Sequence, residues 1–144
     1  MKIALAQINP TVGDLAGNRR LAQEAADKAA SAGADLVVLP ELALTGYPPM
    51  DLLERDRFVD DQLVELDELA KSSHQIAIVV GAVVRTDDER PQSIENAAVV
   101  LAQGKRLGHR SKTLLPTYDV FDESRYFAPA ENRSPIEVPG LDTS

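Results

Sequence analysis

The chain of 144 residues is long enough for one domain with a hydrophobic core and too short for two ordinary domains. Hydrophobic residues make up 44% and charged residues 26%, a balance typical of folded globular proteins rather than disordered ones. The formal charge of −8 disfavours nucleic acid or an anionic membrane as a partner. No apolar run approaches the ~20 residues needed to span a bilayer.

The absence of cysteine restricts the chemistry available within these residues. Disulfides, thiolate metal sites and thiol nucleophiles are excluded from them, and the two histidines, far apart in sequence, do not indicate a metal site. The N-terminal segment alternates apolar and polar residues and lacks a cleavage-site pattern. We therefore interpret it as a first strand and expect a cytoplasmic protein.

The first half of the chain alternates strand and helix patterns. Residues 2–8 predict a strand, and residues 17–32 predict a helix with an alanine-rich face. Residues 35–39 form a short, almost wholly apolar run, typical of a strand covered on both faces. Residues 56–72 carry apolar positions at helical spacing and predict a second helix.

The second half predicts a hairpin followed by irregular chain. Residues 76–84 predict a strand, and residues 96–102 and 106–111 predict two strands joined by a tight turn. The polar segment 85–93 is expected to be an exposed loop, and the chain after Lys112 an ordered loop with about one turn of helix. Residues 136–138 are expected to start another strand. Together these elements predict an α/β layered domain.

Two ionisable residues follow predicted strands directly. Glu41 comes after the strand at 35–39 and Pro40, and Lys112 comes after the strand at 106–111. A carboxylate and an ammonium at one end of a sheet can act as a general base and an electrostatic stabiliser. The spacing alone also fits a structural ion pair, since such pairs occur without any catalytic role.

Three separate blocks resemble the nitrilase-type amidase family. They are "ALAQINPTVGDLAGN" at 4–18, "ADLVVLPELALTGYPPMDLL" at 34–53 and "KTLLPTYDVFDESRYF" at 112–127. Within that family they are most similar to the glutamine-hydrolysing domains of glutamine-dependent NAD synthetases. The resemblance implies an α/β fold, the nitrilase-type α-β-β-α sandwich, of which residues 1–144 would be the N-terminal part, without the synthetase domain.

The resemblance also implies roles for individual residues. Glu41 would be the general base, Lys112 would stabilise the tetrahedral intermediate, and Glu123 would orient the lysine. Tyr118 would contact glutamine, and Tyr47 would line the same pocket. The family's nucleophile is a cysteine on a later strand, so we expect it beyond residue 144 and expect these residues alone to be inactive. A degenerate, inactive relative is the competing interpretation.

The implied reaction is hydrolysis of the glutamine amide, with the ammonia used to convert deamido-NAD to NAD. The family's ATP, Mg²⁺ and deamido-NAD bind to the synthetase domain, so no cofactor is expected within residues 1–144. Glutamine is the expected small-molecule partner, and family members assemble as homo-oligomers. Two alternatives stay open: another nitrilase-type hydrolase, such as a carbamoylase or an ω-amidase, and a non-catalytic interaction module.

Overall fold

The computed structural model describes residues 1–55, 57–86, 93–118, 122–131 and 133–141. Within these ranges the strands form one five-stranded sheet with the order β1-β2-β3-β4-β5. Strands β1, β2 and β3 are parallel, whereas β3, β4 and β5 form an antiparallel meander. The strands are β1 (Ile3–Leu5), β2 (Leu36–Val38), β3 (Ala77–Arg85), β4 (Ile94–Ala102) and β5 (Lys105–Ser111).

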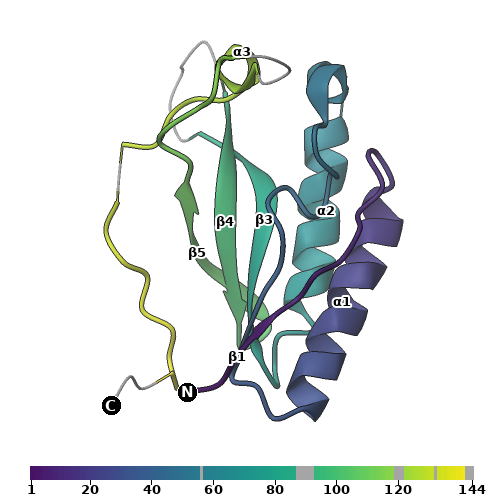
Figure 1. The fold of residues 1–144 in the computed structure, drawn as a ribbon, viewed down its shortest axis with the longest axis vertical. Coiled ribbons are helices and arrows are strands. Elements are labelled where there is room, and N and C mark those ends of the chain that lie inside the picture. The colour runs from purple at the N-terminus through teal and green to yellow at the C-terminus, as the bar shows by residue number, and fades with distance from the viewer. Residues whose placement is uncertain (56, 87–92, 119–121, 132, 142–144) are drawn as a thin grey trace.

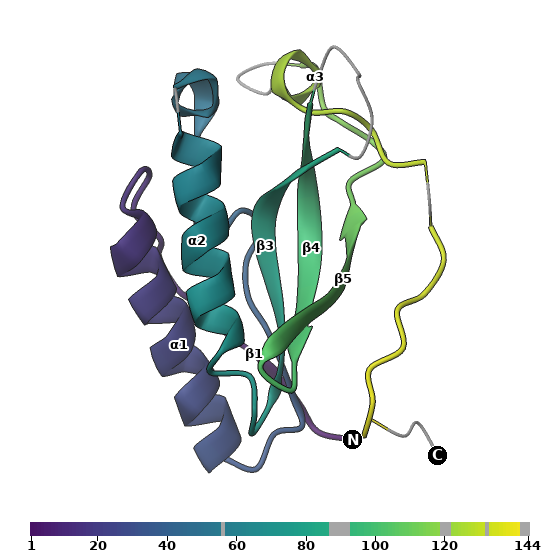
Figure 2. The ribbon, with the colours of Figure 1, turned by 180° about the vertical axis from the view of Figure 1, so that it is seen from behind.

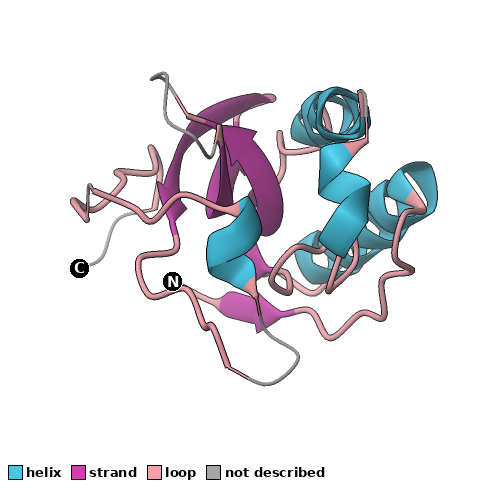
Figure 3. Ribbon diagram, turned by 90° about the horizontal axis from the view of Figure 1, so that it is seen from above, coloured by secondary structure: helices cyan, strands magenta, loops and turns pink. Residues whose placement is uncertain are grey.

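Two long helices cover one face of this sheet, as Figures 1 and 3 show. They are α1 (Leu15–Ser31) and α2 (Phe58–Ala70). The described part of the chain also contains two short helices, the 3-10 helix η1 (Met50–Glu54) and α3 (Glu123–Tyr126). No helix among the described residues is long and apolar enough to cross a membrane.

The alanine-rich face of α1 lies directly on the sheet. Ala22 and Ala26 are buried and pack in one core cluster with Val37 of β2 and Leu66 of α2. Small side chains allow a helix to approach a sheet closely, and the long apolar side chains of the strands and of α2 fill the remaining space. This packing explains why a helix with few large apolar residues is stable here.

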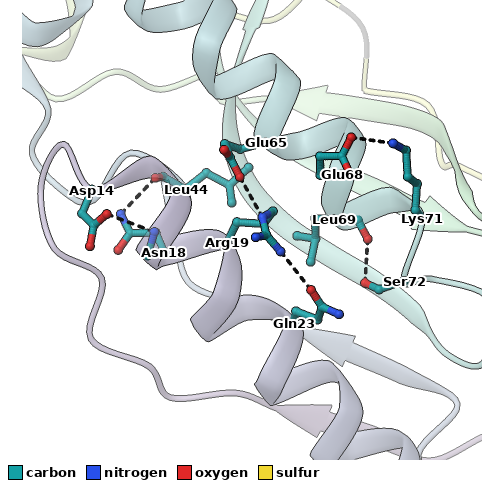
Figure 4. A network of polar contacts seen from close by, with 11 residues as sticks. Asp14, Asn18, Arg19, Gln23, Leu44, Glu65, Glu68, Leu69, Lys71 and Ser72 are labelled. Carbon is teal, nitrogen blue, oxygen red and sulfur yellow. Dashed lines mark hydrogen bonds and ion pairs between the residues drawn. The ribbon is translucent and has the colours of Figure 1, made fainter.

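Polar contacts fix α1 to its neighbours (Figure 4). Asn18 is buried, and its amide donates to the carbonyl oxygen of Leu44 at 2.9 Å. Arg19 pairs with Glu65 of α2, with 2.7 Å between Nε and Oε2. The first contact ties the start of α1 to the segment that follows β2, which is the segment that carries Glu41.

The sequence predicted most elements with small errors at their ends. Both helices, the strand at 76–84 and the hairpin are confirmed, as is the helical turn after Lys112. The first strand is only three residues long, because the main-chain ladder that β1 shares with β2 ends with the bond from Ala6 N to Val38 O. The helix η1 was not predicted. Much of the predicted loop at 85–93 lies outside the described residues.

The strand predicted at 136–138 is wrong. Pro135 and Pro139 flank this segment and have no N–H to donate, so a continuous ladder is unfavourable there. Instead, the guanidinium of Arg110 in β5 donates to the carbonyl oxygens of Ser134 and Pro135. The segment therefore runs beside the sheet without joining it (Figure 2).

The sheet face that points away from α1 and α2 is apolar and partly open to solvent. On β1, Ile3 is 49% and Leu5 is 82% exposed, while Leu36 and Val38 of β2 are half-buried. Exposed apolar surface next to an edge strand favours association with another chain. This face is a candidate contact between copies of the chain.

We therefore expect the 144-residue chain to self-associate at micromolar concentration. Leu5→Lys should weaken the association, because it places a charge on the open face. Val64→Lys is the matched control, since Val64 is an exposed apolar residue on α2, on the opposite side of the molecule. Sedimentation velocity measures the mass. A monodisperse monomer for the unsubstituted chain would contradict the expectation.

Candidate active site

The position of Glu41 is set by the backbone that follows β2. Pro40 leaves the sheet, yet its carbonyl oxygen still accepts a hydrogen bond from Gly81 N of β3 at 3.2 Å. A Cβ atom on Gly81 would lie 2.4 Å from that oxygen and 2.3 Å from Leu42 N. Only glycine lets the turn lie this close to β3, so Gly81 fixes where the Glu41 side chain begins.

Lys112 and Glu123 are placed by main-chain hydrogen bonds on the other side of the site. The N–H of Lys112 donates to the Asn96 carbonyl oxygen at 2.7 Å, which continues the β4–β5 ladder by one residue. Glu123 is the first residue of α3, and its N–H donates to the carbonyl oxygen of Pro116 at 3.1 Å. This bond ties the start of α3 to Pro116, four residues after the lysine.

The ammonium of Lys112 lies between two carboxylates. Its Nζ atom is 2.9 Å from Oε1 of Glu41 and 3.0 Å from Oε2 of Glu123. The expectation that Glu41 and Lys112 share one end of the sheet is confirmed. The two acids differ in exposure, because the side chain of Glu41 is 47% exposed and that of Glu123 only 6%.

The lysine stays charged in this setting. Burial acts to lower the pKa of Lys112, but the hydrogen bonds and charges of Glu41 and Glu123 outweigh it, and the net pKa lies above its ordinary value. Lys112 is therefore a fixed cation at neutral pH. It is suited to stabilising developing negative charge, not to accepting a proton.

Tyr47 extends the cluster by one residue. Its hydroxyl donates to Oε1 of Glu123 at 3.0 Å. The pKa of Tyr47 is raised to about 12, mainly by burial and next by this hydrogen bond to a carboxylate. Tyr118, the second tyrosine that the sequence analysis assigned to the glutamine pocket, is 69% exposed and lines a shallow hollow beside Lys112.

Two further hollows meet at the charged cluster. Glu41, Asn96 and Lys112 border one that lies over the ends of the strands. Tyr47 and Glu123 border another, mainly apolar hollow between the turn after β2 and helix α3. Residues of the charged cluster thus form part of the wall of both hollows.

Asn96 is a site residue that the sequence did not reveal. Its side-chain amide donates to Oε1 of Glu41 at 2.6 Å, and the residue is only 4% exposed. The available signal was a polar residue inside an otherwise apolar strand. That signal alone does not identify a partner 55 residues away.

Comparison with known proteins gives consistent matches. The profile of the carbon-nitrogen hydrolase family matches residues 2–142. The glutamine-dependent NAD(+) synthetase of Synechocystis sp. is 48% identical over 132 residues, which cover 89% of this chain and 24% of that protein. The chain thus spans about a quarter of the length of that relative.

Solved structures give the same picture. The glutamine-dependent NAD+ synthetase from Acinetobacter baumannii, in complex with ADP, is similar with a TM-score of 0.85 and 35% identity, over 96% of this chain and 26% of that one. A variant of the amidase from Nesterenkonia sp. AN1 is similar with a TM-score of 0.78 and 28% identity, over 97% of this chain and 54% of that one. That amidase carries acrylamide added at its active site cysteine.

The contact between Tyr47 and Glu123 predicts that the Tyr47 phenol loses its proton at a higher pH than an ordinary tyrosine. An ordinary tyrosine loses its proton near pH 10, whereas Tyr47 should hold it until about pH 12. The unfolded state then binds fewer protons than the folded state in this window, so stability should fall as the pH rises through it. The raised pKa of Lys112 acts in the same direction.

Subtracting the tyrosinate absorbance of Tyr47→Phe from that of the unsubstituted protein isolates the titration of this phenol. We expect a difference curve with its midpoint near pH 12. A midpoint near pH 10, the value of a free phenol, would contradict the contact.

The close approach at Gly81 predicts a large effect for a single methyl group. Gly81→Ala should destabilise the fold by about 1–3 kcal/mol, because the atoms it would meet belong to backbone that holds Glu41. Gly108→Ala on β5 is the matched control, since its Cβ would meet Ile136 at an ordinary 3.5 Å. Thermal unfolding followed by circular dichroism compares the two. Equal unfolding midpoints for the two variants would contradict the prediction, because they would show that the turn accommodates the added methyl group without cost.

Proposed function

Because the chain belongs to the carbon-nitrogen hydrolase family, we propose that Glu41, Lys112 and Glu123 form the base-and-cation part of an amidase site that hydrolyses the side-chain amide of glutamine. The observation that carries the proposal is the position of the Lys112 ammonium between the two carboxylates. A half-buried cation held by two acids supplies a preorganised positive charge next to a carboxylate that solvent can reach.

Glu41 is the general base of this proposal. A thiol attacks the amide carbon of glutamine, its proton passes to the carboxylate of Glu41, and a carbon–sulfur bond forms. The 144 residues contain no cysteine, so the thiol comes from outside them. The amidase of Nesterenkonia sp. AN1, which has an active site cysteine, supports this choice of nucleophile.

Lys112 stabilises the negative charge that develops on the carbonyl oxygen. Glu41 then returns its proton to the leaving nitrogen, ammonia departs, and a thioester remains. Water, deprotonated by Glu41, hydrolyses the thioester to glutamate and restores the thiol. Glu123 orients the ammonium through the whole cycle, while Tyr47 and Tyr118 line the glutamine pocket.

We further propose that residues 1–144 are the N-terminal part of a glutaminase domain in a glutamine-dependent NAD synthetase. Relatives with that name, 48% and 40% identical to this chain, support the proposal. The ammonia would then serve the ATP-dependent conversion of deamido-NAD to NAD. In this proposal ATP, Mg²⁺ and deamido-NAD would bind to the synthetase domain of such an enzyme and not to residues 1–144.

Other nitrilase-type hydrolases are the second candidate. The amidase from Nesterenkonia sp. AN1, which is similar to this chain over 97% of the chain's length, supports this second candidate. A carbamoylase or an ω-amidase would use the same charged cluster on a different amide. A non-catalytic module would keep the cluster as a structural ion pair and turn over none of these substrates.

Glutamine turnover by the protein as its gene encodes it tests the proposal. Glu41→Gln keeps the shape and removes the base, so ammonia release should fall by about 10²- to 10⁴-fold. Glu24→Gln, on an exposed position of α1, is the matched control and should leave the rate unchanged. Ammonia and glutamate are both measured, with N-carbamoyl amino acids and other ω-amides as competing substrates. Equal rates for Glu41→Gln and the unsubstituted enzyme would overturn the assignment.

A further inference from the structure

Asn96 is a polar residue buried near the start of β4. It lies on β4 opposite Val83 of β3 and next to Ala97, and it is 4% exposed. Burying a side-chain amide is unfavourable unless its hydrogen bonds are satisfied. The Asn96 amide meets this requirement through Glu41, with 2.6 Å between Nδ2 and Oε1.

The same residue also holds the start of the lysine. The carbonyl oxygen of Asn96 accepts the N–H of Lys112 at 2.7 Å, just after β5 ends. One buried residue thus contacts the base through its side chain and the cation through its main chain. Because β4 is paired on both sides, by β3 and by β5, Asn96 has little freedom to move.

The two oxygens of Glu41 are not equivalent. Oε1 accepts from both Asn96 Nδ2 and Lys112 Nζ, at 2.6 and 2.9 Å. Among the described residues, Oε2 of Glu41 accepts no hydrogen bond. A carboxylate oxygen that already accepts two hydrogen bonds is a poor proton acceptor, since both bonds stabilise its negative charge.

We propose that Asn96 is a positioning residue that holds Oε1 of Glu41, so that Oε2 is the oxygen that takes the proton of the attacking thiol. This inference rests on the proposed amidase function. The lysine alone cannot fix the carboxylate plane, because its ammonium also binds Glu123 and donates in three directions. The rigid amide of Asn96 supplies the second anchor that sets the orientation.

Charged and ionisable side chains surround the Glu41 carboxylate. Four ionisable side chains lie around it or border the same hollow: Lys112, Glu123, Tyr47 and Arg110. The guanidinium of Arg110 donates a hydrogen bond to the carbonyl oxygen of Pro135 at 3.0 Å. Asn96 is the neutral donor in this group, so replacing it changes the local charge in a controlled way.

Two substitutions separate positioning from general stability. Asn96→Leu removes the donor at similar size, and Asn96→Asp keeps the shape but places a second carboxylate against Oε1. Both should lower kcat for glutamine by about 10- to 100-fold, because a misplaced base loses alignment with its proton donor. The KM for glutamine should change less than about twofold, since Asn96 acts through Glu41 and not on the substrate.

The pH profile of kcat is the decisive readout. Loss of the donor in Asn96→Leu should move the acid limb to higher pH, and the carboxylate pair in Asn96→Asp should move it further, because two close acids cannot both ionise readily. Glu95→Gln is the matched control: it is the neighbouring buried polar residue of β4 and contacts Ser111 instead of Glu41. It should leave both kcat and the acid limb unchanged.

The outcomes distinguish the inference from the function on which it rests. If Glu41→Gln abolishes turnover while Asn96→Leu and Asn96→Asp keep the kcat and acid limb of the unsubstituted enzyme, Asn96 has no positioning role. If Glu41→Gln itself has no effect, the amidase assignment fails first. Should Asn96→Leu not fold, the isosteric Asn96→Asp decides alone, and an unshifted acid limb in that variant overturns the proposal.

Discussion

The site depends on one ammonium held between two carboxylates that come from distant parts of the chain. Glu41 lies 71 residues before Lys112, and Glu123 lies 11 residues after it. The side chain of Glu123 is almost fully buried, and a buried carboxylate is tolerated only when it is paired. The lysine therefore links the end of the sheet to α3, and a displacement of any one of the three charges would leave another uncompensated.

The backbone around this contact is unusually constrained. Leu42 directly follows Glu41 and has a φ of 47°, and Met50 has a φ of 46°, both in the left-handed region that residues other than glycine avoid. Such a conformation costs on the order of 1–3 kcal/mol and persists where packing holds it. Leu42 is fully buried, so the core offsets the strain. Core packing thus holds the turn that carries Glu41 at its Leu42 side.

Local patterns predicted an α/β layered domain because its helices and long strands have clear periodicity, whereas the nitrilase type of the fold was implied by the resemblance of three sequence blocks. The local patterns also placed Glu41 and Lys112 at strand ends, where a sheet brings distant residues together. The failures have a different origin. Residues 136–138 have apolar residues suited to a strand, but whether they join the sheet depends on the flanking prolines and on Arg110. Asn96 could not be identified, because its partner is defined only by the fold.

The two acids differ in a way that suits them to different tasks. Glu123 is bound by Lys112 and by the Tyr47 hydroxyl, and it is shielded from solvent, so it works as a fixed charge. Glu41 is about half exposed and borders the hollow over the strand ends. A group that exchanges protons with a substrate must reach it, whereas a group that orients a cation must not move. Burial therefore separates the proposed base, Glu41, from its proposed support, Glu123, although both are glutamates.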